Sequence, residues 1–126
     1  MRYFILFTYL LAAAINLAPA IGIFSNDVLG QLYGVEVTSA ELSLLLRHRA
    51  VLFALVGGLL LAAAFQSRLR SQAGIVGLIS MLSFIVLFIV TGADNERLLR
   101  IALIDGVVVS LFIPGFILHL LKRDSA

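Results

Sequence analysis

Asp105 is a carboxylate inside a long apolar stretch, which makes it the residue whose chemistry most needs an explanation. A lone charge in hydrocarbon is costly and therefore pairs with another group or faces a polar cavity. Arg47 and His48, in another apolar stretch, are the expected partners. Such a group can bind an ion, a lipid headgroup or a small solute. The alternative is an ion pair that only fixes helix packing.

Other polar residues recur at a similar depth in the apolar stretches. Counted at about 1.5 Å per helical residue, Asn16, His48, Ser83 and Asp105 lie roughly 12 Å from the same end of the molecule. This coincidence predicts one polar pocket in that half of the chain. The pocket residues that we expect are Arg47, His48 and Asp105, with Asn16, Arg49, Ser83 and Arg100 lining or supporting them.

The direction of each arginine follows from the predicted packing face of its helix. Small residues recur at four-residue spacing through Gly58, and small residues allow helices to approach closely in a membrane. At 100° per residue, Arg47 lies about 20° from Gly58 and is predicted to point into the bundle. Arg49 is predicted to point away, toward lipid headgroups. A pair of Arg47 with Asp105 requires their two spans to be adjacent.

The sequence gives no sign of catalysis or of a bound cofactor. Cysteine is absent, and His119 lies near the opposite end from His48, so we predict neither a metal site nor haem. Phosphate-binding glycine loops, HExxH and GxSxG are missing, which leaves no catalytic residue and argues against an enzyme. The basic residues form no run interleaved with aromatics, so nucleic acid is not an expected partner.

The composition of the chain predicts which secondary-structure elements carry these candidate site residues. The 126 residues are 62% hydrophobic and 13% charged, which excludes an ordinary soluble domain. At about 20 apolar residues per crossing, the chain is predicted to be an all-α, four-helix transmembrane bundle in one membrane domain, residues 1–126. The predicted spans are about 3–24, 40–65, 73–93 and 97–121, followed by a solvated tail at 122–126.

The connections carry recognisable helix signals. Pro19 is expected to kink the first span. After it, Ser25 to Gly34 reads as a short interfacial amphipathic segment, with an N-cap at its start and glycine at its end. The segment Thr38-Ser39-Ala40-Glu41 has a capping-box pattern that opens the second span.

Three spans carry small residues every four positions, and one carries them every three. These faces predict helix packing, and they would also suit a homo-oligomer. The faces are Thr8, Ala12, Asn16 and Ala20; Ala50, Ala54, Gly58 and Ala62; Gly74, Gly77, Ser80 and Ser83; and Ala102, Gly106, Ser110 and Pro114.

Basic residues predict the orientation of the chain. Arg2, Arg68, Arg70, Lys122 and Arg123 lie on the side of the two termini, whereas the arginines of the other side lie inside helix ends. The positive-inside rule therefore favours cytoplasmic termini. The lipid bilayer is the expected partner, with a lipid or small solute as ligand.

A resemblance adds to this interpretation. Tyr33-Gly34, followed by Leu44-Leu45-Leu46-Arg47-His48-Arg49-Ala50-Val51-Leu52-Phe53 at the start of the second span, is similar to small, uncharacterised bacterial four-helix membrane proteins. Their layout is that of DoxX-like and domain-of-unknown-function families. The resemblance implies a four-helix protein of the bacterial cytoplasmic membrane.

Overall fold

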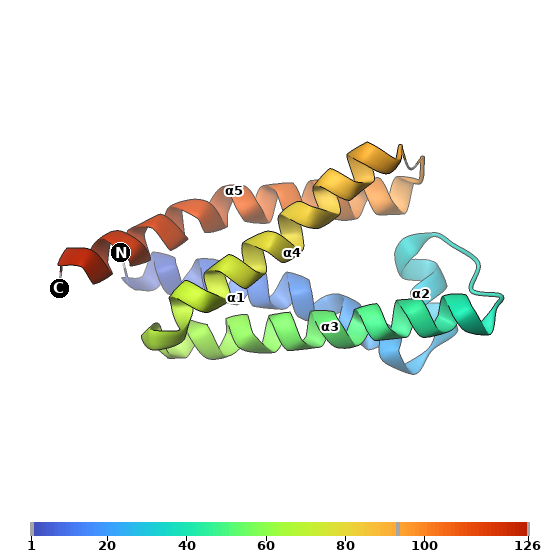
Figure 1. The fold of residues 1–126 in the computed structure, drawn as a ribbon, viewed down its shortest axis with the longest axis horizontal. Coiled ribbons are helices and arrows are strands. Elements are labelled where there is room, and N and C mark those ends of the chain that lie inside the picture. The colour runs from blue at the N-terminus through green and yellow to red at the C-terminus, as the bar shows by residue number, and fades with distance from the viewer. Residues whose placement is uncertain (1, 93, 126) are drawn as a thin grey trace.

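The protein is an all-α bundle in which four helices are long and apolar enough to cross a membrane (Figure 1). The computed structural model describes the backbone of residues 2–92 and 94–125, and their side chains up to residue 122. The elements are α1 (Arg2–Leu17), the 3-10 helix η1 (Ala18–Phe24), α2 (Asn26–Tyr33), α3 (Ala40–Phe65), the 3-10 turn η2 (Ser67–Leu69), α4 (Arg70–Thr91) and α5 (Glu96–Ser125).

The four long helices are confirmed, and their ends differ from those of the predicted spans. The third begins earlier than residue 73, because η2 leads directly into α4 at Arg70. It ends at Thr91, where Gly92 adopts the left-handed conformation, and residue 93 lies outside the described residues. The helical backbone of α5 continues beyond the predicted end of the last span at residue 121, as far as Ser125.

Local sequence signals explain the elements between the first two spans. Pro19 stands where α1 gives way to η1, since proline cannot continue the α-helical hydrogen bonds. The Ser25 Oγ accepts the amide of Asp27 at 3.2 Å and so caps α2, which ends at the left-handed Gly34. The capping-box frame was one residue off: Ser39 is the N-cap of α3 and accepts from the amide of Leu42.

The four long helices form a ring of neighbours. α1 packs against α3 and α5, and α4 packs against the same two helices, so α3 and α5 face each other diagonally. The adjacency of α3 and α5 that an Arg47–Asp105 pair requires is therefore wrong. Both termini lie at one end of the bundle, and α2 covers the other, which we call the α2 end (Figure 1).

The two ends of the bundle are packed differently. Near the termini, the Phe112 ring lies between those of Tyr9, tilted against it at a centroid distance of 4.8 Å, and Phe116, stacked on it at 6.2 Å. Gly115 lies directly against Thr8 there, where a Cβ would not fit. Toward the α2 end, α4 and α5 diverge from α3, and the cavities described below lie between them (Figure 1).

The predicted packing faces are largely correct on α1 and α4, whereas on α3 and α5 only Ala50 and Ala102 of the predicted residues are buried. Thr8, Ala12 and Asn16 are buried on α1, and Gly74 and Gly77 are buried on α4. On α3, however, Gly57 packs against Leu17, while Gly58 has open space beside it. On α5, Gly106 has open space too, and Ser110 and Pro114 are exposed. A homo-oligomer through these exposed faces stays a prediction.

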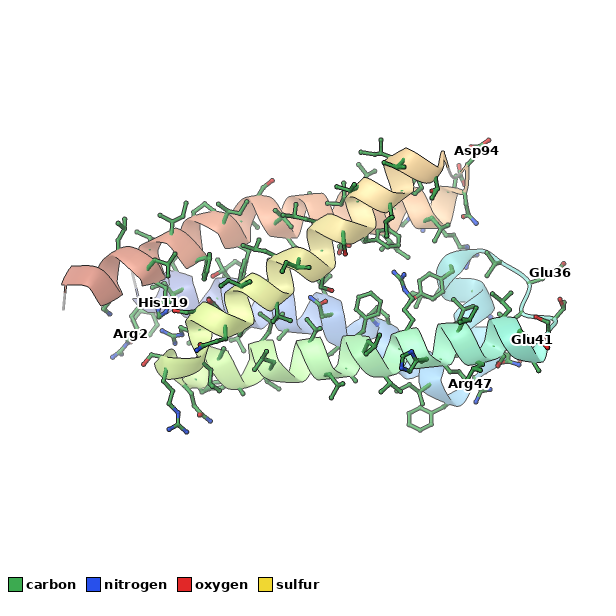
Figure 2. The ribbon with its side chains drawn as sticks, in the orientation of Figure 1. Arg2, Glu36, Glu41, Arg47, Asp94 and His119 are labelled. Atoms are coloured by element: carbon green, nitrogen blue, oxygen red, sulfur yellow. The ribbon has the colours of Figure 1, made fainter. Side chains whose placement is uncertain are left out.

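Charged side chains gather at the ends of the bundle (Figure 2). Arg2 and His119 lie near the termini, whereas Glu36, Glu41 and Asp94 lie at the α2 end. Large apolar side chains are exposed along α3, α4 and α5 between these ends. This distribution is what a bilayer requires of a membrane protein.

Candidate functional site

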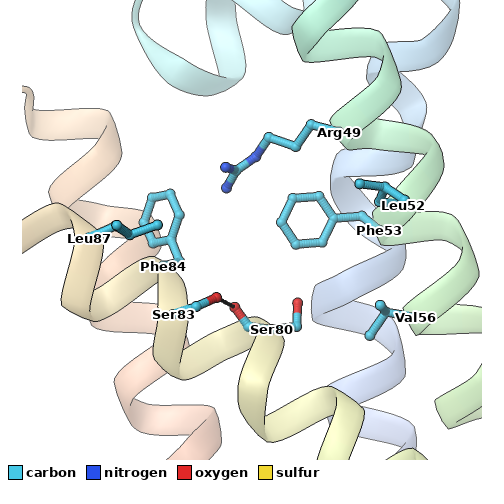
Figure 3. Close-up of a pocket in the computed structure, with 8 residues that line it drawn as sticks. All are labelled: Arg49, Leu52, Phe53, Val56, Ser80, Ser83, Phe84 and Leu87. Carbon is cyan, nitrogen blue, oxygen red and sulfur yellow. Dashed lines mark hydrogen bonds between the residues drawn. The ribbon is translucent and has the colours of Figure 1, made fainter.

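Arg49 is the charged side chain around which the α2 end is organised. Its guanidinium lies over the rings of Phe53, Phe84 and Tyr33, with Cζ 4.9, 5.0 and 5.5 Å from the three centroids (Figure 3). We call these three rings the aromatic cage. They come from α3, α4 and α2, so the cage forms only when all three helices meet.

The aromatic cage leaves the hydrogen-bonding capacity of Arg49 unused. Each ring attracts the cation by about 0.5–2 kcal/mol but supplies no conventional acceptor for its five N–H donors. Nε is buried without a hydrogen-bond partner, and no hydrogen bond or ion pair joins Arg49 to any described residue. The hydroxyl of Tyr33, in a residue that is 4% exposed, is likewise buried without a partner. Two neighbouring donors are therefore free.

Two cavities adjoin Arg49. The first, the lateral groove, has a volume of about 170 Å³ and lies between α3 and α4 (Figure 3). Its rim residues Leu52 and Leu87 are exposed on the apolar surface of the bundle. The groove is lined by Arg49, Leu52, Phe53, Val56, Ser80, Ser83, Phe84 and Leu87.

The second cavity, the inner cavity, has a volume of about 120 Å³ and shares Arg49 and Phe53 with the lateral groove. It brings residues of α1, η1, α2, α3 and α5 together beneath α2. Its lining is apolar apart from Asn16, Tyr33, Arg49 and Asp105. The complete lining is Ile15, Asn16, Ala18, Pro19, Leu32, Tyr33, Arg49, Phe53, Ile101, Ile104 and Asp105.

Asn16 and the serines of α4 join the two cavities through hydrogen bonds. Ser80 Oγ donates to Asn16 Oδ1 at 3.3 Å, and Ser83 Oγ donates to the carbonyl of Ser80 at 2.9 Å. Asn16 Nδ2 donates to the carbonyl of Ala12 at 2.8 Å. Both serine hydroxyls and one N–H of Asn16 are therefore engaged, whereas the Arg49 guanidinium and the Tyr33 hydroxyl have no acceptor among the described residues.

Arg47 does not reach Asp105, so the predicted pairing is wrong. The Arg47 guanidinium instead donates to Asn26 Oδ1 at 3.0 Å, to Ser43 Oγ at 3.1 Å and to the carbonyl of Ile23 at 3.2 Å. It thereby ties the start of α2 to α3 on the outside of the aromatic cage. Its role in this fold is to hold α2 in place.

The remaining predicted site residues divide between the site and the surface. Asn16 and Asp105 line the inner cavity, and Ser83 lines the lateral groove. His48 is exposed and lines neither cavity. Arg100 is exposed and borders a separate apolar groove between α1 and α5. Among the described residues, no three His, Cys, Asp or Glu side chains could hold a metal ion together.

The prediction reversed Arg47 and Arg49 because it used the wrong glycine. At 100° per residue, Arg49 lies about 20° from Leu60, which is fully buried, and Arg47 lies about 20° from the exposed Gly58. The aromatic cage was missed too, although the i, i+4 spacing of Arg49 and Phe53 places them on one helix face. Nothing local in the sequence connects Tyr33 or Phe84 with Arg49.

No protein-family model matches the chain, and neither the curated proteins nor the solved structures contain a match. The resemblance to DoxX-like proteins therefore stays a prediction.

Proposed function

We propose that this membrane protein binds the phosphate group of a membrane lipid at Arg49. The observation that carries the proposal is the Arg49 guanidinium, whose buried Nε has no acceptor in the described residues, next to the unpartnered hydroxyl of Tyr33. A phosphate is an acceptor that arginine binds in a planar, two-point geometry. A tyrosine hydroxyl can add one further hydrogen bond.

The lateral groove supports a lipid rather than a water-soluble anion as ligand. Below Arg49 the groove is walled by Leu52, Val56 and Leu87, and its rim lies on the surface that faces hydrocarbon. Acyl chains suit such a wall because both surfaces are apolar, so contact between them removes no polar group from water. Arg49 lines both cavities, so a lipid with chains in the lateral groove can place its headgroup toward the inner cavity.

The distribution of basic residues supports a specific membrane and orientation: the bacterial cytoplasmic membrane, with both termini in the cytoplasm. In that orientation the α2 end faces outward. Arg49 then binds a lipid of the outer leaflet, or one that crosses toward it.

A tryptophan reporter tests the proposal, because the chain contains no Trp. Phe84→Trp keeps an aromatic ring beside Arg49 and places one fluorophore in the aromatic cage. The protein is reconstituted in vesicles that contain dibrominated phosphatidylethanolamine, dibrominated phosphatidylglycerol or, for comparison, dibrominated diacylglycerol. We expect both phospholipids to quench the fluorescence of this single tryptophan more strongly than diacylglycerol, which lacks the phosphate.

The second substitution in this background is Arg49→Gln, and Arg100→Gln is its matched control. Arg100 lies outside both cavities, so its replacement removes the same charge without touching the site. We expect phospholipid to bind about ten-fold more tightly than diacylglycerol when Arg49 is present. This preference should disappear with Arg49→Gln and survive Arg100→Gln. Equal quenching by phospholipid and diacylglycerol in the protein that retains Arg49 would refute the proposal.

A further inference from the structure

The inner cavity also contains a carboxylate, opposite in charge to Arg49. Asp105 is 7% exposed and lines this cavity from α5. No hydrogen bond or ion pair within 4.0 Å joins its carboxylate to any described residue. The cation that acts on this carboxylate electrostatically is Arg49, which lies beyond hydrogen-bonding distance, so the carboxylate can still accept hydrogen bonds from a ligand.

Arg49 and Asp105 reach the inner cavity from diagonally opposed helices. α3 carries the guanidinium and α5 carries the carboxylate, and the two helices do not pack against each other. The charges therefore share a cavity without forming an ion pair. A ligand with separated opposite charges can bridge them, whereas a purely anionic ligand gains at Arg49 and is repelled by Asp105.

The chemistry of the lining selects the cationic group, because Asp105 and the unpartnered hydroxyl of Tyr33 can both accept hydrogen bonds in the inner cavity. A primary ammonium is compact and donates three hydrogen bonds, which suits a carboxylate and the hydroxyl of Tyr33. A trimethylammonium group is larger and donates none.

We propose that the lipid bound at this site has a zwitterionic, ethanolamine-type headgroup, with its phosphate on Arg49 and its ammonium on Asp105. This inference rests on the proposed function, since it assigns the phosphate to the same guanidinium. It adds a selectivity for the headgroup that Arg49 alone does not provide.

The test uses the Phe84→Trp reporter and compares its quenching by dibrominated phosphatidylethanolamine, phosphatidylglycerol and phosphatidylcholine at equal mole fraction. We expect phosphatidylethanolamine to bind about five-fold more tightly than the other two, the ratio that one charge-assisted contact of about 1 kcal/mol supplies. With Asp105→Asn the ratio to phosphatidylglycerol should fall to about one. Asp94→Asn, which removes a carboxylate from the exposed loop before α5, should leave it unchanged.

Asp105→Glu keeps the charge and should retain the preference, which guards against a folding defect in Asp105→Asn. Soluble phosphoethanolamine tests whether the ligand is a lipid or a free water-soluble molecule with the same charges. Relief of quenching by phosphoethanolamine, but not by glycerol phosphate, supports recognition of the water-soluble zwitterion at the same site. Relief by neither supports the lipid.

An unchanged ratio of phosphatidylethanolamine to phosphatidylglycerol in Asp105→Asn would overturn the inference. In that case the proposed function still stands if Arg49→Gln removes the preference of both phospholipids over diacylglycerol. Loss of neither preference overturns both proposals.

Discussion

Arg49 is held inside the bundle by aromatic rings rather than by a carboxylate. Three cation–π contacts of about 0.5–2 kcal/mol each are together similar in size to a membrane-insertion cost of about 2.5–3.5 kcal/mol. The two terms nearly cancel, so the arginine contributes little net stability to the empty protein. A residue that is nearly neutral for folding and rich in unused donors is well placed to bind a ligand.

Replacing Arg49 by Met should therefore change the free energy of unfolding in uncharged detergent by less than about 1 kcal/mol. The methionine fills a similar volume among the same rings. Adding phosphatidylethanolamine should raise the unfolding temperature of the unmodified protein and leave that of Arg49→Met unchanged, as measured by thermal unfolding. A loss of several kcal/mol without lipid would instead identify Arg49 as a structural residue.

At the scale of elements, α2 is held against the bundle from two sides. Arg47 binds its start through Asn26, while Asn95 Nδ2 donates to the carbonyls of Tyr33 and Gly34 at its end, both at 3.0 Å. Arg97 also donates to the carbonyl of Gln31. Because α2 contributes Tyr33 to the aromatic cage, these contacts help to position the site.

Arg47→Gln should loosen α2 while leaving Arg49 in place. The substitution removes hydrogen bonds to Asn26, Ser43 and the carbonyl of Ile23. We expect amide exchange in residues 26–33 to accelerate about ten-fold, as a net loss of about 1–2 kcal/mol implies, with α4 unaffected. His48→Gln, one residue away and outside both cavities, is the control. Unchanged exchange in α2 would contradict the role assigned to Arg47.

Helix ends could be predicted from the sequence, but the inward faces of α3 and α5 could not. Ser25, Gly34 and Ser39 act through local hydrogen bonds and backbone conformation, so they mark their helices without tertiary information. α3 is apolar on every side in its second half, so hydropathy identifies no inward face. Only the contact of Gly57 with Leu17, which depends on another helix, identifies that face.

At the scale of the whole molecule, a closely packed half supports a half that contains cavities. Gly115 against Thr8 and Gly74 against Phe116 and Tyr9 bring the helices together near the termini. The helices then diverge toward the α2 end, where Arg49 and Asp105 lie (Figure 1). The sequence predicts a polar pocket in the half near the α2 end. The residues that line it could not be predicted, because they depend on α3 and α5 being diagonal to each other rather than adjacent.

Two glycines of α5 provide a matched test of this packing. Gly115→Ala places a Cβ against Thr8 and should destabilise the protein by about 1–3 kcal/mol. Gly106→Ala meets open space in the same helix, and it should be neutral or stabilise by up to about 1 kcal/mol. Chemical unfolding in detergent measures both. Equal effects of the two substitutions would contradict the packing described for the end near the termini.

The proposed orientation can be tested because the chain contains no native cysteine. Glu36→Cys lies in the loop after α2, and Arg68→Cys lies in the exposed turn between α3 and α4. In intact bacterial cells, a membrane-impermeant maleimide should label the Glu36→Cys variant and spare the Arg68→Cys variant. The opposite pattern would place the termini outside.

The most direct test of the central claim is the distance between the lipid phosphorus and the guanidinium carbon of Arg49. Solid-state NMR measures it as ³¹P-dependent dephasing of ¹³Cζ in arginine-labelled protein, reconstituted with phosphatidylethanolamine. We predict a dephased signal that disappears with Arg49→Gln and persists with Arg100→Gln. Dephasing that is the same with and without Arg49 would show that no lipid phosphate lies against this residue.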